Sequence, residues 1–130
     1  MCINAITEKI IGASIEVHNH LGPGLLESTY EACLAKEFQL RSIQFERQKP
    51  LQVIYKNYQV EDCSYKLDFF VEGKVILELK ALKELAPIHT AQVMTYLKLM
   101  NCQIGLLINF NVSYLKNGIE RIVNNLNEDE

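Results

Sequence analysis

Hydrophobic residues recur every three or four positions at the start of the chain, which is the pattern of an amphipathic helix. The first stripe consists of Ile3, Ile6, Ile10, Ala13 and Val17. It stops at the sequence Leu-Gly-Pro-Gly of residues 21–24, where glycine and proline interrupt the helix. A second helix is predicted to follow and to end near residue 40. Its inner side would carry Leu26, Tyr30, Cys33, Leu34 and Phe38.

From residue 43 onward the hydrophobic period changes to two, which predicts β-strands. Residues 51–55 alternate, and so do residues 63–71, where Cys63, Tyr65, Leu67, Phe69 and Val71 would share one face. The tripeptide Glu-Gly-Lys at 72–74 has the composition of a turn. The next strand, residues 75–80, places Val75, Leu77 and Leu79 on one face and Ile76, Glu78 and Lys80 on the other. These runs predict a β-hairpin.

A third helix is predicted to begin at Pro87, because proline suits the first helical turn. Its apolar stripe would be Ile88, Ala91, Met94 and Leu97. Residues 104–108 form a continuous apolar run, which is typical of a strand covered on both faces. Residues 118–125 fit a short edge strand or a last helix, and the strand is favoured. The pattern predicts an α/β fold with a mixed sheet of about four to five strands flanked by helices.

The length of 130 residues suits a single domain, taken here as residues 1–126. Residues 127–130 are expected to form an acidic, flexible tail, since Glu128, Asp129 and Glu130 end the chain.

Two acidic residues and a lysine stand on the predicted hairpin. Glu78 and Lys80 are two positions apart on one strand and therefore point to the same side. A two-residue turn would send Asp68 and Glu78 to opposite faces. A three-residue loop at 72–74 would pair Val71 with Val75 and set Asp68 opposite Glu78, with the side chains about 5 Å apart. We adopt the second register as a hypothesis, because two such close acids would repel each other unless they shared a divalent cation.

An oxygen-rich site of two or three carboxylates suits Mg²⁺ or Mn²⁺, which lower the pKa of a bound water and neutralise phosphate. Lys80 would add a positive charge where negative charge develops in phosphoryl transfer. The alternative is that all three residues are solvated on an open face, although acids in strand centres are disfavoured.

Two motifs resemble a known family. The segment Gly24-Leu25-Leu26-Glu27-Ser28-Thr29-Tyr30 resembles the signature of the GxxExxY protein family. Asp68 with Glu78-Leu79-Lys80 resembles the acidic and lysine motif of the PD-(D/E)XK nuclease superfamily, to which that family is similar. Leu67 replaces the proline of the superfamily's name. The resemblance implies a restriction-endonuclease-like core and metal-dependent phosphodiester cleavage.

The resemblance also implies roles for individual residues. Asp68 and Glu78 would be metal ligands, and Lys80 would steady the attacking water or the transition-state charge. Glu27 corresponds to a helical acid that some branches add to the metal site, whereas its place in a first helical turn also allows a capping role. Tyr30 is interpreted as a packing residue that positions Glu27, with its hydroxyl on a site carboxylate.

Substrate contacts are implied on the third helix. Gln92 and Tyr96 resemble a glutamine and tyrosine pattern of exonuclease-like branches. His89 shares their helix face, and such a polar stripe could equally face solvent.

The net charge of −3 argues at first against a nucleic-acid partner. Setting aside the C-terminal acids leaves thirteen acidic and thirteen basic residues, so net charge does not decide the question. The chain has no basic run, no Trp and no aromatic series suited to base stacking. Binding of the substrate would therefore depend on scattered lysines, on a second copy of the chain or on a partner protein.

Cys2, Cys33, Cys63 and Cys102 are widely spaced, which favours reduced, mostly buried thiols in a cytoplasmic protein. No apolar run is long enough for a membrane helix.

The leading interpretation is a divalent-metal-dependent nuclease acting on nucleic acid, with DNA favoured over RNA. The alternative is a non-catalytic module that retains the nuclease-like fold and binds nucleic acid or protein.

Overall fold

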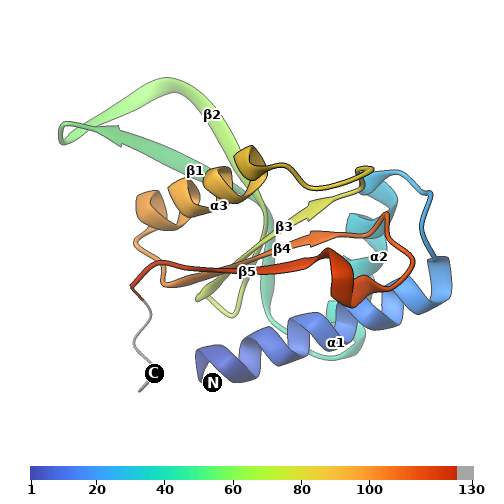
Figure 1. Cartoon of the computed structure of the whole chain (residues 1–130). Coiled ribbons are helices and arrows are strands. Elements are labelled where there is room, and N and C mark those ends of the chain that lie inside the picture. Colours follow the sequence, from blue (N-terminus) through green and yellow to red (C-terminus); the bar gives the residue numbers. More distant parts are fainter. Residues whose placement is uncertain (126–130) are drawn as a thin grey trace.

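A five-stranded mixed sheet carries the fold, with its strands in the order β1-β2-β3-β4-β5 (Figure 1). The computed structural model describes residues 1–125. The elements along the chain are α1 (Ile3–Leu21), α2 (Glu27–Leu40), β1 (Phe45–Tyr55), β2 (Tyr58–Val71), β3 (Val75–Lys80), α3 (Pro87–Met100), β4 (Ile104–Asn109), the 3₁₀ helix η1 (Leu115–Gly118) and β5 (Ile119–Val123). Strands β3 and β4 are parallel, and the other neighbours are antiparallel. The predicted α/β class is confirmed.

Helices α1 and α2 cover one face of the sheet (Figure 1). The predicted stripe of α1 is fully buried, and it packs against the faces of β2, β3 and β4 that carry Phe69, Leu77 and Leu106. In α2, Tyr30, Leu34 and Phe38 are buried as predicted. Leu26 is the exception: it is 74% exposed, because it is the N-cap residue and precedes the first helical turn.

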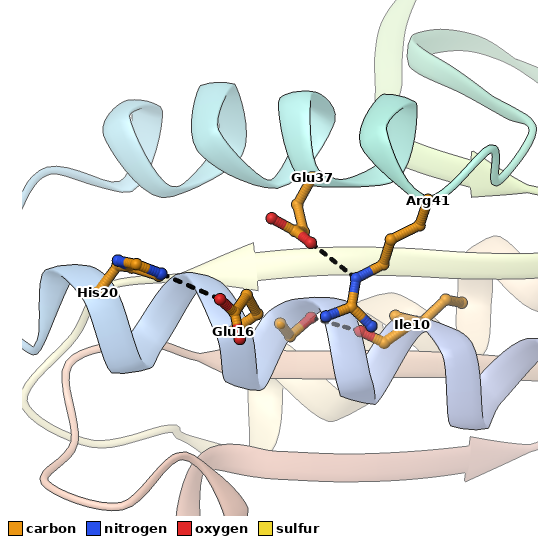
Figure 2. A network of polar contacts seen from close by, with 6 residues as sticks. Ile10, Glu16, His20, Glu37 and Arg41 are labelled. Atoms are coloured by element: carbon orange, nitrogen blue, oxygen red, sulfur yellow. Dashed lines mark hydrogen bonds and ion pairs between the residues drawn. The ribbon is translucent and has the colours of Figure 1, made fainter.

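Polar contacts lie on the outer side of α1 and α2. Figure 2 shows Arg41, the C-cap residue of α2, beside Glu37, with 2.7 Å between Arg41 Nε and Glu37 Oε2. It also shows His20 of α1 bonded to Glu16. Solvent-exposed ion pairs of this kind contribute only about 0–1 kcal/mol each. The packing of α1 and α2 therefore depends mainly on the apolar side chains buried beneath them.

Helix α3 covers the opposite face of the sheet (Figure 1). The predicted apolar stripe is partly wrong: Leu97 is buried, but Ile88 is 70% exposed, and Val93 and Tyr96 take the inner positions. The reason lies in β4, where a Cβ on Gly105 would come within 2.9 Å of Val93 Cγ1. The close approach that glycine permits turns the Val93 side of α3 toward the sheet.

The hairpin between β2 and β3 has the predicted register. Val71 pairs with Val75 across the loop of residues 72–74, and the Lys74 N–H donates to the Val71 carbonyl. Ladder pairing between β2 and β3 ends at Phe69 and Leu77. Beyond that point β2 stays paired only with β1, and Leu67 packs on the α3 side rather than with Phe69 and Val71, which corrects the predicted face.

Strands β1 and β2 continue past the sheet as a two-stranded arm (Figure 1). We use the name arm for residues 52–66. Its tip is the pair Tyr55 and Tyr58, joined by Lys56 and Asn57, which have φ values of 50° and 70°. Positive φ at both central residues is the geometry of a type I′ hairpin turn. The sequence pattern had indicated strands at 51–55 and 63–71 but not the intervening part of β2.

The remaining expectations have mixed outcomes. Strand β4 is buried along its whole length, and β5 forms an edge of the sheet, as predicted. All four cysteines are free, but Cys2 and Cys63 are exposed and the other two are half-buried, so the expectation of mostly buried thiols is wrong. No helix within residues 1–125 is long and apolar enough to cross a membrane. The predicted acidic tail, 127–130, lies outside the described residues.

Candidate functional site

The carboxyl groups of Asp68 and Glu78 meet where β2 separates from β3. Extending the register of Phe69 with Leu77 by one residue sets Asp68 opposite Glu78. Here a side-chain hydrogen bond replaces the backbone pairing of β2 with β3. The Asp68 Oδ2 accepts a hydrogen bond of 2.8 Å from the Leu79 N–H. Asp68 is thereby fixed to the backbone of the strand that carries Glu78 and Lys80.

The Glu78 carboxyl is buried without enough hydrogen bonds or positive charge to stabilise its ionised form. Its side chain is 4% exposed, and its Oε1 has no hydrogen-bond partner among the described residues. Burial first, and then hydrogen bonding with and the charge of Asp68, raise the pKa of Glu78 to about 10, while Lys80 lowers it. A second carboxylate in such a position must be protonated or must share a cation.

Glu27 lies at the first position of α2 and faces the same region. Burial raises the pKa of its carboxyl, and so do the charges of Asp68 and Glu31, while Lys80 acts in the opposite direction. These influences place Glu27 within electrostatic reach of the Asp68 and Glu78 pair. Its side chain is nevertheless the most exposed of the three acids, and it can also interact favourably with the N-terminus of α2.

A bridging amide connects α2 to Asp68. Gln48 Nε2 donates to Glu31 Oε1 at 2.6 Å and to Asp68 Oδ1 at 3.2 Å, and Arg47 pairs with the other Glu31 oxygen at 2.8 Å. Gln48 has a φ of 53° inside β1, a left-handed conformation that is unfavourable for a non-glycine residue. The sequence did not point to Gln48 and Arg47, because the alternating pattern of a strand does not show which of its polar residues contacts a distant element.

Tyr30 organises the loop before α2 rather than a carboxylate. Its buried hydroxyl donates to the Gly22 carbonyl at 2.6 Å and accepts from the Leu25 N–H at 3.2 Å. Gly24, with a φ of 99°, donates its N–H to Asn111 Oδ1. The Gly24 and Tyr30 positions of the signature thus hold the loop from which Glu27 starts, and the hydroxyl contact predicted for Tyr30 is wrong.

Asn109 holds the segment that follows Lys80. Its side chain accepts from the Leu82 N–H and donates to the Leu82 carbonyl, each at 3.0 Å. The Phe110 N–H donates to the Lys80 carbonyl at 2.9 Å. These bonds fix both ends of the turn after β3, and sequence reasoning missed Asn109 because it stands at the end of an apolar strand.

The third helix brings its three predicted residues to one groove. His89, Gln92 and Tyr96 line it together with Lys80 of β3. Tyr96 is buried, so the alternative of a solvated stripe does not hold for it. Burial and then the charge of Glu78 raise the pKa of Tyr96. His89 is half-buried and also caps α3, because its Nδ1 accepts a hydrogen bond from the Ala86 N–H.

The predicted site residues are therefore gathered around one place, although they do not form a closed metal cage. Within residues 1–125, no group of three or more His, Cys, Asp or Glu side chains is arranged to hold a metal ion. The close pair is Asp68 and Glu78, with Lys80 beside it and Glu27 at its rim.

Comparison with known proteins gives one match. A family model described as the PD-(D/E)XK nuclease superfamily covers residues 4–122, which include every candidate site residue. The chain belongs to the PD-(D/E)XK nuclease superfamily. Nucleases of this superfamily generally use divalent metals. Neither a curated protein nor a solved structure matches the chain.

Proposed function

We propose that the chain is a divalent-metal-dependent nuclease that hydrolyses phosphodiester bonds in nucleic acid, with DNA as the favoured substrate. The observation that carries the proposal is the buried Glu78 carboxyl, which lies against Asp68 with one oxygen unpartnered among the described residues. A pair of close acids beside a lysine is destabilising as a purely structural feature. Membership in a nuclease superfamily supports the same conclusion.

The residues present fit Mg²⁺ or Mn²⁺. Mg²⁺ is bound in many enzymes through one or two carboxylates, substrate phosphates and several retained waters. Asp68 and Glu78 would supply the carboxylates, and Glu27 would approach from the start of α2. When bound, the cation would lower the pKa of a water and neutralise charge on the phosphate.

The chain's own side chains would orient and stabilise the reacting groups. Asp68 is held in place by the Leu79 N–H and by Gln48. Lys80 provides a positive charge where negative charge builds up on the phosphate and would steady the attacking water. His89, Gln92 and Tyr96 would contact the substrate along the groove that begins at Lys80.

The test combines metal binding with cleavage. Calorimetry with Mn²⁺ should detect binding to the wild type and at least tenfold weaker binding to Glu78→Gln, since the substitution removes a charged ligand. Cleavage of single- and double-stranded DNA and RNA in Mg²⁺ or Mn²⁺ should fall by a factor of about 10² to 10³ in Lys80→Ala.

Glu8→Gln and Lys9→Ala are matched controls, because both residues are exposed on α1, on the opposite face of the sheet from α3. Both controls should retain wild-type activity. Equal activity in the wild type, Glu78→Gln and Lys80→Ala would refute the site, and a folded protein that binds no metal would favour the interaction module.

A further inference from the structure

The arm and helix α3 enclose a groove that leads away from the carboxylate pair. Its volume is about 590 Å³. One wall comes from the arm, with Val53, Cys63 and Tyr65, and the other wall comes from α3, on the side that carries His89, Gln92 and Tyr96. Lys80 lines the groove as well, so the groove is continuous with the proposed phosphate site. Figure 1 shows the arm extending past the sheet along α3.

Two tyrosine rings from different elements stand together in this groove. Tyr65 of the arm and Tyr96 of α3 have ring centroids 6.3 Å apart, tilted by 59°. Tyr65 remains 48% exposed, so part of its ring is free to contact a ligand. The sequence has no aromatic series, but the pairing of β1 with β2 brings Tyr65 close to a helix that starts 22 residues later.

The polar character of the groove is equally specific. None of the ten residues that line it is acidic, and Lys80 is the lysine among them. His89, Gln92 and Thr95 supply hydrogen-bonding groups along α3. An apolar and aromatic interior with a few polar groups is the usual composition of a site for a flat organic ring. The absence of carboxylates among the lining residues also allows a phosphodiester chain to approach.

We propose that this groove receives at least one unpaired base of a single-stranded nucleic acid, stacked on Tyr65, while the adjoining phosphate lies at Asp68, Glu78 and Lys80. The inference rests on the proposed nuclease function and names its substrate class. It assigns Tyr65 as a substrate-binding residue that neither the sequence motifs nor the superfamily match indicates.

A single strand fits this geometry better than a duplex. Each base in a duplex has its faces covered by its neighbours, so it must be unstacked and unpaired before it can reach a tyrosine ring. That step requires a few kcal/mol, whereas an unpaired strand presents its bases directly. Stacking of a base on an aromatic side chain contributes about 1–3 kcal/mol and depends little on sequence. Preference for single strands with weak sequence dependence is therefore the expected behaviour.

Binding of fluorescein-labelled oligonucleotides tests the inference independently of cleavage. Fluorescence anisotropy would be recorded with the full chain in Ca²⁺, an oxygen-liganded cation that differs from Mg²⁺ in size and geometry. The probes are a 12-nucleotide DNA strand, the same strand as RNA and the corresponding duplex. The single-stranded DNA should bind at least tenfold more tightly than the duplex. Tyr65→Ala should weaken single-strand binding about 5- to 100-fold, the range that follows from the loss of one stacked base.

Matched variants separate stacking from structural damage. Tyr65→Phe keeps the ring and should bind within about twofold of the wild type. Tyr58→Ala removes a tyrosine that is 75% exposed at the arm tip and does not line the groove, so binding should not change. A 2-aminopurine placed in the strand should change its fluorescence with the wild type and not with Tyr65→Ala. Circular dichroism and thermal unfolding verify that each variant is folded.

Two results would overturn the inference: equal affinity for single strands and duplex, or unchanged affinity in folded Tyr65→Ala. The experiments distinguish a failure of the groove assignment from a failure of the proposed nuclease function. If the protein cleaves duplex in a metal-dependent reaction whose rate Tyr65→Ala does not change, the groove assignment alone is refuted. Tyr65-dependent binding of single strands without cleavage would retain the groove assignment and refute catalysis. The RNA probe tells whether the groove discriminates between the two sugars.

Discussion

Replacing Glu78 by glutamine should make the metal-free protein more stable, although it removes a residue of the proposed site. The carboxyl is buried, faces Asp68 and leaves one oxygen without a hydrogen-bond partner among the described residues. Glutamine has nearly the same shape and carries no charge, and its amide can donate to the Asp68 carboxylate. The substitution therefore removes the charge penalty without creating a cavity.

The sign and size follow from the raised pKa. In the unfolded chain Glu78 loses its proton near pH 4.5, whereas in the native protein the pKa is about 10. Between these values the native state binds more protons, so its free energy of unfolding falls as pH rises. Each pH unit changes that energy by at most about 1.4 kcal/mol for one proton. From pH 5.5 to 8.0 the wild type should lose roughly 3 kcal/mol relative to Glu78→Gln.

Urea unfolding in EDTA at several pH values measures this difference directly. Titrating groups far from Glu78 affect both proteins alike, so the comparison isolates Glu78 together with the groups coupled to it. Mn²⁺ should stabilise the wild type, by about 2.7 kcal/mol at a hundredfold excess over Kd, and should affect the variant much less, so the difference between the two proteins should become smaller. If the difference in unfolding free energy between the wild type and Glu78→Gln stays constant from pH 5.5 to 8.0, burial does not raise the pKa of Glu78.

Substitutions at two further positions test the residues that support the site. Gln48→Gly and Gln48→Ala should each weaken Mn²⁺ binding about tenfold, as loss of a residue that orients a ligand typically does. Because Gln48 has a left-handed φ of 53°, Gln48→Gly should be about 1 kcal/mol more stable than Gln48→Ala in thermal unfolding. Gly118→Ala should destabilise the fold by at least about 3 kcal/mol, because its Cβ would clash with the Asn109 carbonyl oxygen.

The chain offers a control for Gly118→Ala. Gly73→Ala adds a Cβ with no atom within 4 Å, at a φ of 66°, and should cost only about 1 kcal/mol. Equal losses for Gly73→Ala and Gly118→Ala would contradict the close approach at Asn109. Unchanged Mn²⁺ affinity in both Gln48 variants would limit Gln48 to a role in the shape of β1.

The element order was predictable because most segments carry a clear hydrophobic period. The stripe of α1 and the apolar run of β4 each have one possible buried surface, and both are buried as predicted. Helix α3 has apolar residues on more than one side, so its sequence does not fix which side faces inward. The contact of Val93 with Gly105 decides that, and it joins residues from two different elements.

For the site, the sequence by itself determined that Glu78 and Lys80 share one face of a strand, because successive side chains alternate between the two faces. It left two registers open for Asp68, and the pairing of Val71 with Val75 in the structure decides between them. Only the tertiary structure decided that Glu78 is buried, that Gln48 connects Glu31 to Asp68, and that Tyr65 faces Tyr96. These features depend on how α2, the arm and α3 pack around the end of β3, and packing between distant segments leaves no periodic trace in a single sequence.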